Sequence, residues 1–387
     1  MDDAVVRQVI GRCQELTPAE CEEFLSNGFV VIRSAFDRRI AEEVVEQAWR
    51  SLEQDANILR DDRESWKKMP YVRPAGSKRS IRLAEEAPRA LRAQTDLLGG
   101  GERLKGGGNL AWGDGTVANL CKDGDRPYPE PRPEMDGWHF DGWDFYHYLD
   151  SPEQALLVVP LFSDIKPHSG GTLIATDSIG VVAKFLAAHP EGVHPDGTQG
   201  GGYLIPSLIE QCTQFVEVTG DAGDLVLLHP YMLHRAAANP SGVARFIQNG
   251  RLSLAEPMDF NRPNPADYSL VELAVCVCVC ARARARACVC VRVWHSLSLC
   301  LSLRVCAQVL RALGVDRLQW KPNGPRENND KLTDWGRVPP RPFRTDAQRE
   351  EQAAVIAAEQ ATHTHTHTLS LSLSLSLSLS LSLSLSL

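Results

Sequence analysis

The sequence lacks any stretch of about 18 uninterrupted apolar residues, the length that a membrane-spanning helix needs. Its start, Met1-Asp2-Asp3, lacks the basic and then apolar segments of a secretory signal peptide. Basic residues are outnumbered, with 41 Lys and Arg against 49 Asp and Glu and a net charge of −8. We therefore expect no nucleic-acid or membrane partner. We predict an intracellular protein, cytoplasmic by default, and leave a peroxisomal or other organellar location open.

Cysteine is scarce outside one stretch of low complexity. Of the 11 cysteines, seven lie at positions 276–306, and the other four are Cys13, Cys21, Cys121 and Cys212. These four show neither the spacing of a metal site nor that of a disulfide framework. Such a pattern is ordinary in a reducing compartment.

Two stretches of the chain consist of alternating residue pairs. Val275–Gln308 alternates Cys with Val, Ala with Arg and again Cys with Val, and then continues in Ser-Leu pairs. From Thr362 to Leu387, Thr alternates with His and then Leu with Ser. Uninterrupted GT, GC, CA and CT dinucleotide repeats translate into these alternations. We interpret the first stretch as a retained intron and the second as translation past the original C-terminus.

Deleting Val275–Gln308 restores one good helix, from Ser269 and Glu272 through Ala274 into Val309–Gly314. Ser followed three residues later by Glu is a capping box, and the glycine suits a C-terminal cap. As written, the chain is expected to leave this helix after about one and a half turns. The alternative is a functional strand whose Cys-x-Cys pairs bind a soft metal.

We predict one domain that is mainly β with flanking helices. Its parts are residues 1–274 and, as a C-terminal helix and irregular wrap, residues 309–345; residues 275–308 are the insert and 346–387 a tail. From Leu110 onward the segments are short, β-rich and punctuated by Gly, Pro and Asp, as in a sandwich or jelly roll. The predicted helices cover about 18–27, 37–54, 89–98 and 179–189, and the clear strands 29–33, 155–162, 171–175, 214–219, 224–229 and 244–249.

His139 and Asp141 are separated by one residue in Gly137-Trp-His-Phe-Asp-Gly-Trp143. On a strand such residues point to the same face, about 7 Å apart at Cα. An imidazole and a carboxylate on one face are two of the three ligands of the triad that holds Fe(II) in non-haem oxygenases. The alternative is a partly buried salt bridge.

The third ligand should come from a distant strand, and the segment 223–234 offers His229 and His234. His234 is favoured because Arg245 follows it by eleven residues, where its planar guanidinium could bind the distal carboxylate of 2-oxoglutarate. His229 stays open as a core or supporting histidine. A second His-x-Asp pair, His194 and Asp196, lies in a Pro-Asp-Gly turn and is expected to be a surface loop.

These residues resemble the phytanoyl-CoA dioxygenase family of Fe(II)- and 2-oxoglutarate-dependent oxygenases. The matching segments are His139-Phe-Asp141, Gly170-Gly-Thr-Leu, and Gly223–His234 continued to Arg245. The resemblance covers roughly residues 17–262 and the helix rejoined at position 309. It implies a double-stranded β-helix core, with His139, Asp141 and His234 on iron and Arg245 on 2-oxoglutarate.

The resemblance further implies an enzyme that uses Fe(II), 2-oxoglutarate and O2 to hydroxylate a small organic or acyl substrate, releasing succinate and CO2. We predict that Asn119 and Thr172 contact the cosubstrate and that Trp138, Trp143 and Tyr146 line the substrate pocket, although aromatic residues there are as often core. The sequence departs from the family pattern at Phe140, Arg235 and Ala236. The alternatives are a cupin-like metal-binding protein or isomerase without oxygenase activity, and a non-catalytic product of an incorrectly assembled gene.

Overall fold

Short antiparallel strands form the centre of the fold. The computed structural model describes residues 3–74, 80–106, 110–113, 115–124, 126–142, 145, 147–190, 192–193, 206–260 and 262–278. All of them belong to one compact unit, Met1–Trp335. Several predicted features lie outside these residues, namely Trp143, Tyr146, the His194 and Asp196 pair, and the predicted elements beyond position 278. No helix in the described part of the chain is both long and apolar enough to cross a membrane.

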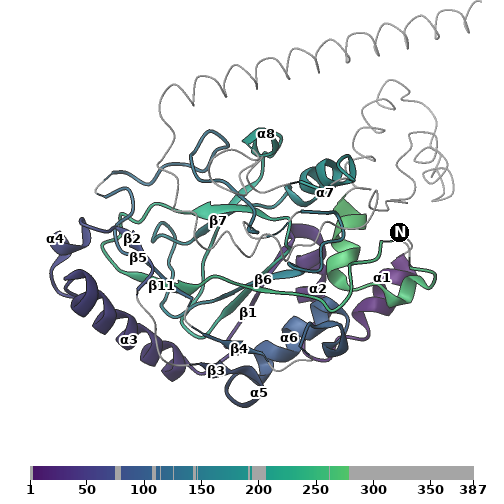
Figure 1. Cartoon of the computed structure of the whole chain (residues 1–387), viewed down its shortest axis with the longest axis horizontal. Helices are drawn as coiled ribbons and strands as arrows, with labels where there is room; N and C mark the ends of the chain where they lie inside the picture. The colour runs from purple at the N-terminus through teal and green to yellow at the C-terminus, as the bar shows by residue number, and fades with distance from the viewer. Residues whose placement is uncertain are drawn as a thin grey trace, which may run out of the picture. The chain divides into compact units, whose positions relative to one another are not determined.

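Helices and strands alternate irregularly along the chain (Figure 1). The helices are α1 (Asp3–Ile10), α2 (Pro18–Asn27), α3 (Arg38–Ala56), α4 (Arg63–Trp66), α5 (Leu83–Glu86), α6 (Pro88–Leu98), α7 (Ile179–Ala187) and α8 (Pro206–Ile209), with 3-10 turns at Gly101–Arg103 and Pro265–Asp267. The strands are β1 (Phe29–Ile32), β2 (Tyr71–Val72), β3 (Ile81–Arg82), β4 (Ala111–Trp112), β5 (Thr116–Asn119), β6 (Leu156–Pro160), β7 (Thr172–Ala175), β8 (Phe215–Val218), β9 (Leu225–Leu228), β10 (Leu233–Ala236), β11 (Arg245–Gln248) and β12 (Gly250–Leu252).

The strands form separate small sheets, and every strand pairing among the described residues is antiparallel. Their orders are β1-β9-β6-β12, β10-β7-β8, β11-β5-β2 and β3-β4. Strands that are distant in sequence are neighbours, since β1 pairs with β9 and β5 with β11. The architecture is therefore mixed α/β with antiparallel sheets, in which helices contribute more than the predicted mainly-β class implies.

The N-terminal helix signals are confirmed. Thr17 Oγ1 accepts a hydrogen bond from the Glu20 backbone N–H, and the Thr17 N–H donates to the Glu20 carboxylate at 2.8 Å, which completes the capping box. Gly28 ends the helix with a left-handed φ of 73° and donates its N–H to the Phe24 carbonyl. The carboxylate of Asp37 likewise caps α3 at the Arg39 N–H. The ends of these two helices can therefore be predicted from the local sequence, without knowledge of the tertiary structure.

The predicted strands are present but shorter. The segments 155–162, 171–175, 214–219, 224–229 and 244–249 contain β6, β7, β8, β9 and β11, each of four or five residues. Strands β6 and β9 are buried along their whole length, and each pairs on both edges. Their continuous apolar sequences follow from that burial, because a strand covered on both faces needs no polar alternation.

A helix over residues 270–278 begins where the capping box predicts it. Ser269 Oγ accepts from the Glu272 N–H at 3.1 Å, and the Ser269 N–H donates to the Glu272 carboxylate at 2.8 Å. That carboxylate is almost fully buried and forms ion pairs with Arg103 and Arg262. The helix continues to Cys278, so the expectation that it ends near Ala274 is wrong. The first Cys-Val pairs are apolar enough to extend the packed face.

Removing Val275–Gln308 together with the residues after 360 should raise the melting temperature and the soluble fraction of the protein. In the joined chain, Val309 takes the position of the fully buried Val275, and Gly314 supplies a C-terminal cap. The deletion also removes seven cysteines and the long uncharged Leu-Ser run, which favours aggregation. Thermal melting and transcript sequencing test the hypothesis. It is wrong if only unspliced message exists and the shortened protein melts at a lower temperature.

Candidate metal centre

Two histidines that are far apart in sequence are joined by a reciprocal backbone bridge. The His139 N–H donates to the His234 carbonyl at 3.0 Å, and the His234 N–H donates to the His139 carbonyl at 2.8 Å. His234 lies on β10, whereas His139 makes a single bridge and belongs to no regular strand. The predicted strand at 139–141 is therefore reduced to one bridge residue, but this bridge fixes the two imidazoles side by side.

Both imidazoles present the same nitrogen to the site. Nδ1 of His139 lies 2.8 Å from the Gly137 carbonyl, and Nδ1 of His234 lies 2.9 Å from the Met232 carbonyl. A carbonyl only accepts, so each Nδ1 donates, and in the neutral imidazole Nε2 then keeps its lone pair. Metal-binding histidines are commonly oriented by such a bond to the ring nitrogen that does not bind the metal.

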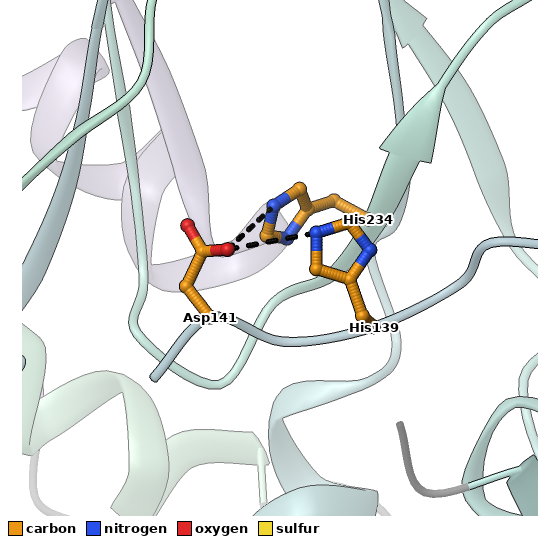
Figure 2. A group of neighbouring side chains, drawn as sticks. All are labelled: His139, Asp141 and His234. Atoms are coloured by element: carbon orange, nitrogen blue, oxygen red, sulfur yellow. Dashed lines mark ion pairs between the residues drawn. The ribbon is translucent and has the colours of Figure 1, made fainter. Parts of the chain in front are cut away.

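Asp141 points at both Nε2 atoms (Figure 2). Its Oδ1 lies 3.5 Å from Nε2 of His139 and 3.8 Å from Nε2 of His234. One ligand atom from each of the three residues falls within 4.8 Å of the others. Metal–ligand bonds of about 2.1 Å place two ligand atoms of one ion about 3–4 Å apart. The predicted group is thus brought together at a separation that one metal ion can span.

The protonation states suit a metal site. Burial lowers the pKa of His234 to about 4, with a further contribution from His139, so that its imidazole is neutral at pH 7. Burial opposes ionisation of Asp141, but His234, His139 and a hydrogen bond from Asn249 together hold the pKa of this carboxyl well below its usual range. Neutral imidazoles and an ionised carboxylate are the states that bind a divalent metal.

His229, the competing ligand candidate, faces elsewhere. Its Nε2 lies 3.2 Å from the Val271 carbonyl, and its Nδ1 accepts from the Tyr231 N–H at 3.1 Å. Both ring nitrogens are therefore engaged with the backbone, and the side chain is fully buried. His229 ties the end of β9 to the helix at 270–278, which is the core role that the sequence left open.

Arg245 is buried without a full set of partners. Its side chain is 1% exposed, and its Nε donates to the Gly170 carbonyl at 2.6 Å. Its Nη1 has no hydrogen-bond partner among the described residues. Burial lowers the pKa of the guanidinium, and Tyr71 and the Glu217 carboxylate offset only part of this effect. The guanidinium packs near the ring of Tyr71, with Cζ 5.8 Å from the ring centroid. A buried cation with unpaired N–H groups is unfavourable until an anion binds it.

No protein-family model and no curated protein matches the chain. One similar solved structure is that of the epimerase SnoN in complex with Fe3+, alpha ketoglutarate and nogalamycin RO. The sequence identity is 18%, the match covers 66% of this chain and 86% of SnoN, and the TM-score is 0.38. A second is HygX from Streptomyces hygroscopicus with nickel and 2-oxoglutarate bound, at 15% identity and a TM-score of 0.34. This match covers 62% of this chain and 88% of HygX. A third is EctD from S. alaskensis with bound Fe, at 18% identity and a TM-score of 0.35. This match covers 65% of this chain and 83% of EctD. Similarities of this size carry no argument about function.

Asn119 has a structural role in the site. Its amide donates to the carbonyls of Gly170 and Ala237, at 3.1 and 3.0 Å, and its Oδ1 accepts from the Lys122 N–H. In this structure both of its amide N–H groups bind backbone carbonyls. Gly170 has a φ of 82°, and a Cβ there would lie 2.6 Å from the Asn119 amide. The glycine therefore allows the close approach that anchors both Asn119 and Arg245.

Thr172 lies on the same side of its sheet as His234. In the antiparallel register Thr172 is opposite Ala236, and Ile174 is opposite His234. Directly opposed residues share a face, as do residues two apart on one strand. Thr172 borders a small, mostly apolar cavity between strands, whose other lining residues are Val159, Leu161, Ile165, Val218, Val226 and Leu228.

Trp138 belongs to the core. Its ring packs against Phe215 at 5.2 Å between centroids, its Nε1 donates to the Arg132 carbonyl, and its side chain is 6% exposed. Trp138 is therefore placed as a core residue, which is the alternative that the sequence left open for the aromatic residues beside the metal motif. Sequence analysis missed Asn249, whose amide donates to Oδ2 of Asp141 at 3.2 Å. The available signal was its position four residues after Arg245 in the sequence.

Proposed function

We propose that this protein is a non-haem Fe(II) oxygenase that uses 2-oxoglutarate as cosubstrate, on a double-stranded β-helix core like that of the phytanoyl-CoA dioxygenase family. The observation that carries the proposal is a pair of features. One is the group formed by His139, Asp141 and His234. The other is the buried guanidinium of Arg245, whose Nη1 has no hydrogen-bond partner among the described residues. A metal group alone fits many proteins, whereas a metal group with a buried cation fits a ligand that chelates the metal and carries a distant carboxylate.

The donor set fits Fe(II). Two imidazole nitrogens and one carboxylate oxygen on one side of an ion form the facial triad of non-haem Fe(II) oxygenases, which leaves further positions open. We assign Nε2 of His139, Nε2 of His234 and Oδ1 of Asp141 as the ligand atoms, because these atoms converge. No thiolate of the described residues belongs to the group, which argues against a structural zinc site of the Cys-rich kind.

The cosubstrate is assigned to the space between the metal group and Arg245. Arg245 begins β11, Asn249 directly follows the end of this strand, and Asn249 contacts Asp141. A guanidinium anchored at Nε to Gly170 keeps other N–H groups for a carboxylate. Ala236 lacks the hydroxyl that would assist there, and Thr172, directly opposite it, is assigned that role.

When bound, Fe(II) would supply the redox chemistry that couples oxidation of a substrate C–H bond by O2 to decarboxylation of 2-oxoglutarate. In the balanced reaction, C–H, O2 and 2-oxoglutarate become C–OH, succinate and CO2. The chain's own residues hold the carboxylates, keep the imidazoles in one tautomer and limit access of water. The substrate is assigned only as a class, a small organic or acyl molecule, because the metal site determines the type of reaction and not the molecule that reacts.

Substrate-dependent succinate release tests the proposal. The Fe(II)-loaded protein should convert 2-oxoglutarate slowly to succinate without a substrate, and faster with the correct member of a panel of acyl-CoA thioesters, free acids and secondary metabolites. His139→Ala provides the background rate. If wild-type protein that binds one Fe(II) per chain releases no more succinate than His139→Ala throughout the panel, the cupin-like or non-catalytic alternative is correct.

A further inference from the structure

The two oxygens of the Asp141 carboxylate have different surroundings. Oδ1 faces both histidines, and the two ion-pair contacts of Figure 2 converge on this one atom. Oδ2 accepts a hydrogen bond from Nδ2 of Asn249 at 3.2 Å. Because a carboxylate can bind a metal through one oxygen or through both, a donor on Oδ2 bears directly on how Asp141 binds.

The backbone places Asn249 firmly. It directly follows β11, whose residues Arg245–Gln248 pair with Thr116–Asn119 of β5, and Ile247 also forms a bridge with Leu161. Within β11, Arg245 and Ile247 point to one face, whereas Gln248 points to the other and lies beside Gly115. The Asn249 side chain is half-buried, so its hydrogen bond is only partly screened by water.

We propose that Asn249 is a positioning residue that occupies Oδ2 and keeps Asp141 bound to the metal through Oδ1 alone. This inference rests on the proposed function. With Asp141 donating one oxygen, the three residues would leave positions on the ion for the two oxygens of 2-oxoglutarate and for O2. If Asp141 donated both oxygens, one of these positions would be lost. Asn249 therefore protects the vacancy that the reaction needs.

One extended segment then sets two separate features of the site. Arg245 would hold the far carboxylate of the cosubstrate, and Asn249, directly after the same strand, orients the metal-binding carboxylate.

Asn249→Ala and Asn249→Asp test the inference with Co(II) as a spectroscopic substitute for iron. Loss of a hydrogen bond to a metal-binding side chain typically weakens metal binding about 10–100-fold. We expect this for Asn249→Ala, together with a changed Co(II) visible spectrum as the carboxylate becomes free to bind through both oxygens. Asn249→Asp keeps the shape of the side chain but lacks the donor, and should weaken 2-oxoglutarate binding as well. Circular dichroism confirms that each variant is folded.

Gln248→Ala is the matched control, because it alters the neighbouring side chain on the opposite face. Its metal affinity and Co(II) spectrum should stay within about twofold of wild type, since nothing in the site is removed. Wild-type protein that binds Co(II) but not 2-oxoglutarate would overturn the proposed function itself. Wild-type protein that binds both, with folded Asn249 variants indistinguishable from it in spectrum and affinities, would overturn only the role of Asn249.

Discussion

Replacing His234 with Ala removes stoichiometric Fe(II) binding and with it all succinate release, the largest effect expected of any single substitution. The remaining His139 and Asp141 supply only two ligand atoms, and the loss leaves a polar gap beside the half-buried carboxylate of Asp141. His139→Ala and Asp141→Ala should have the same result, because each removes one member of a three-ligand group. Bound iron per chain, measured by elemental analysis after dialysis, gives the outcome directly.

His229→Ala is the matched control for His234→Ala. His229 is also a buried histidine and lies five residues earlier, but both of its ring nitrogens are bonded to the backbone. Its loss should lower the melting temperature, because the Val271 carbonyl and the Tyr231 N–H lose a buried partner. The folded variant should still bind one Fe(II). Iron binding that survives His234→Ala but not His229→Ala would show that the ligand assignment is wrong.

Replacing Arg245 with Met raises the 2-oxoglutarate concentration needed for half-maximal turnover by roughly one to two orders of magnitude. A hydrogen bond to a charged group contributes roughly 1.5–3 kcal/mol, and each 1.4 kcal/mol is a factor of about ten in affinity. Iron binding should be unchanged, because Arg245 contacts Gly170 and no metal ligand. Titration of succinate release with 2-oxoglutarate measures the shift.

Arg235→Met serves as the control for Arg245→Met. Arg235 is also a buried arginine, 6% exposed, but it follows His234 directly on β10 and therefore points to the opposite face. The control should leave the 2-oxoglutarate requirement within a few-fold of wild type while it changes stability. Equal shifts for both variants, or no shift for Arg245→Met, would contradict the assignment of the cosubstrate carboxylate to Arg245.

The sequence alone predicted the three residues that the fold brings together. The His-x-Asp spacing and the distance from His234 to Arg245 carry this information without any contact being known. The orientation of the imidazoles could not be predicted, because it depends on the carbonyls of Gly137 and Met232. The strand at His139 is only a single bridge, because its pairing is limited to the one residue opposite His234.

Contacts between distant segments account for what the sequence could not reveal. Glu272 appears in the sequence only as part of a helix cap, but folding surrounds it with Arg103, 169 residues away, and Arg262. Cys13 and Cys21 lack disulfide spacing, yet their Sγ atoms lie 3.6 Å apart because the turn before α2 folds back. The two backbone carbonyls that accept from the Asn119 amide, those of Gly170 and Ala237, are likewise distant in sequence.

The most direct test of the proposed function is the visible absorption of the Fe(II)-loaded protein on anaerobic addition of 2-oxoglutarate. Chelation of Fe(II) by the keto acid should produce a weak charge-transfer band in wild-type protein. The band should be absent from His234→Ala, and in Arg245→Met it should appear only at much higher 2-oxoglutarate. Wild-type protein that binds one Fe(II) per chain but shows no band at saturating 2-oxoglutarate would contradict the account and favour a cupin-like metal protein.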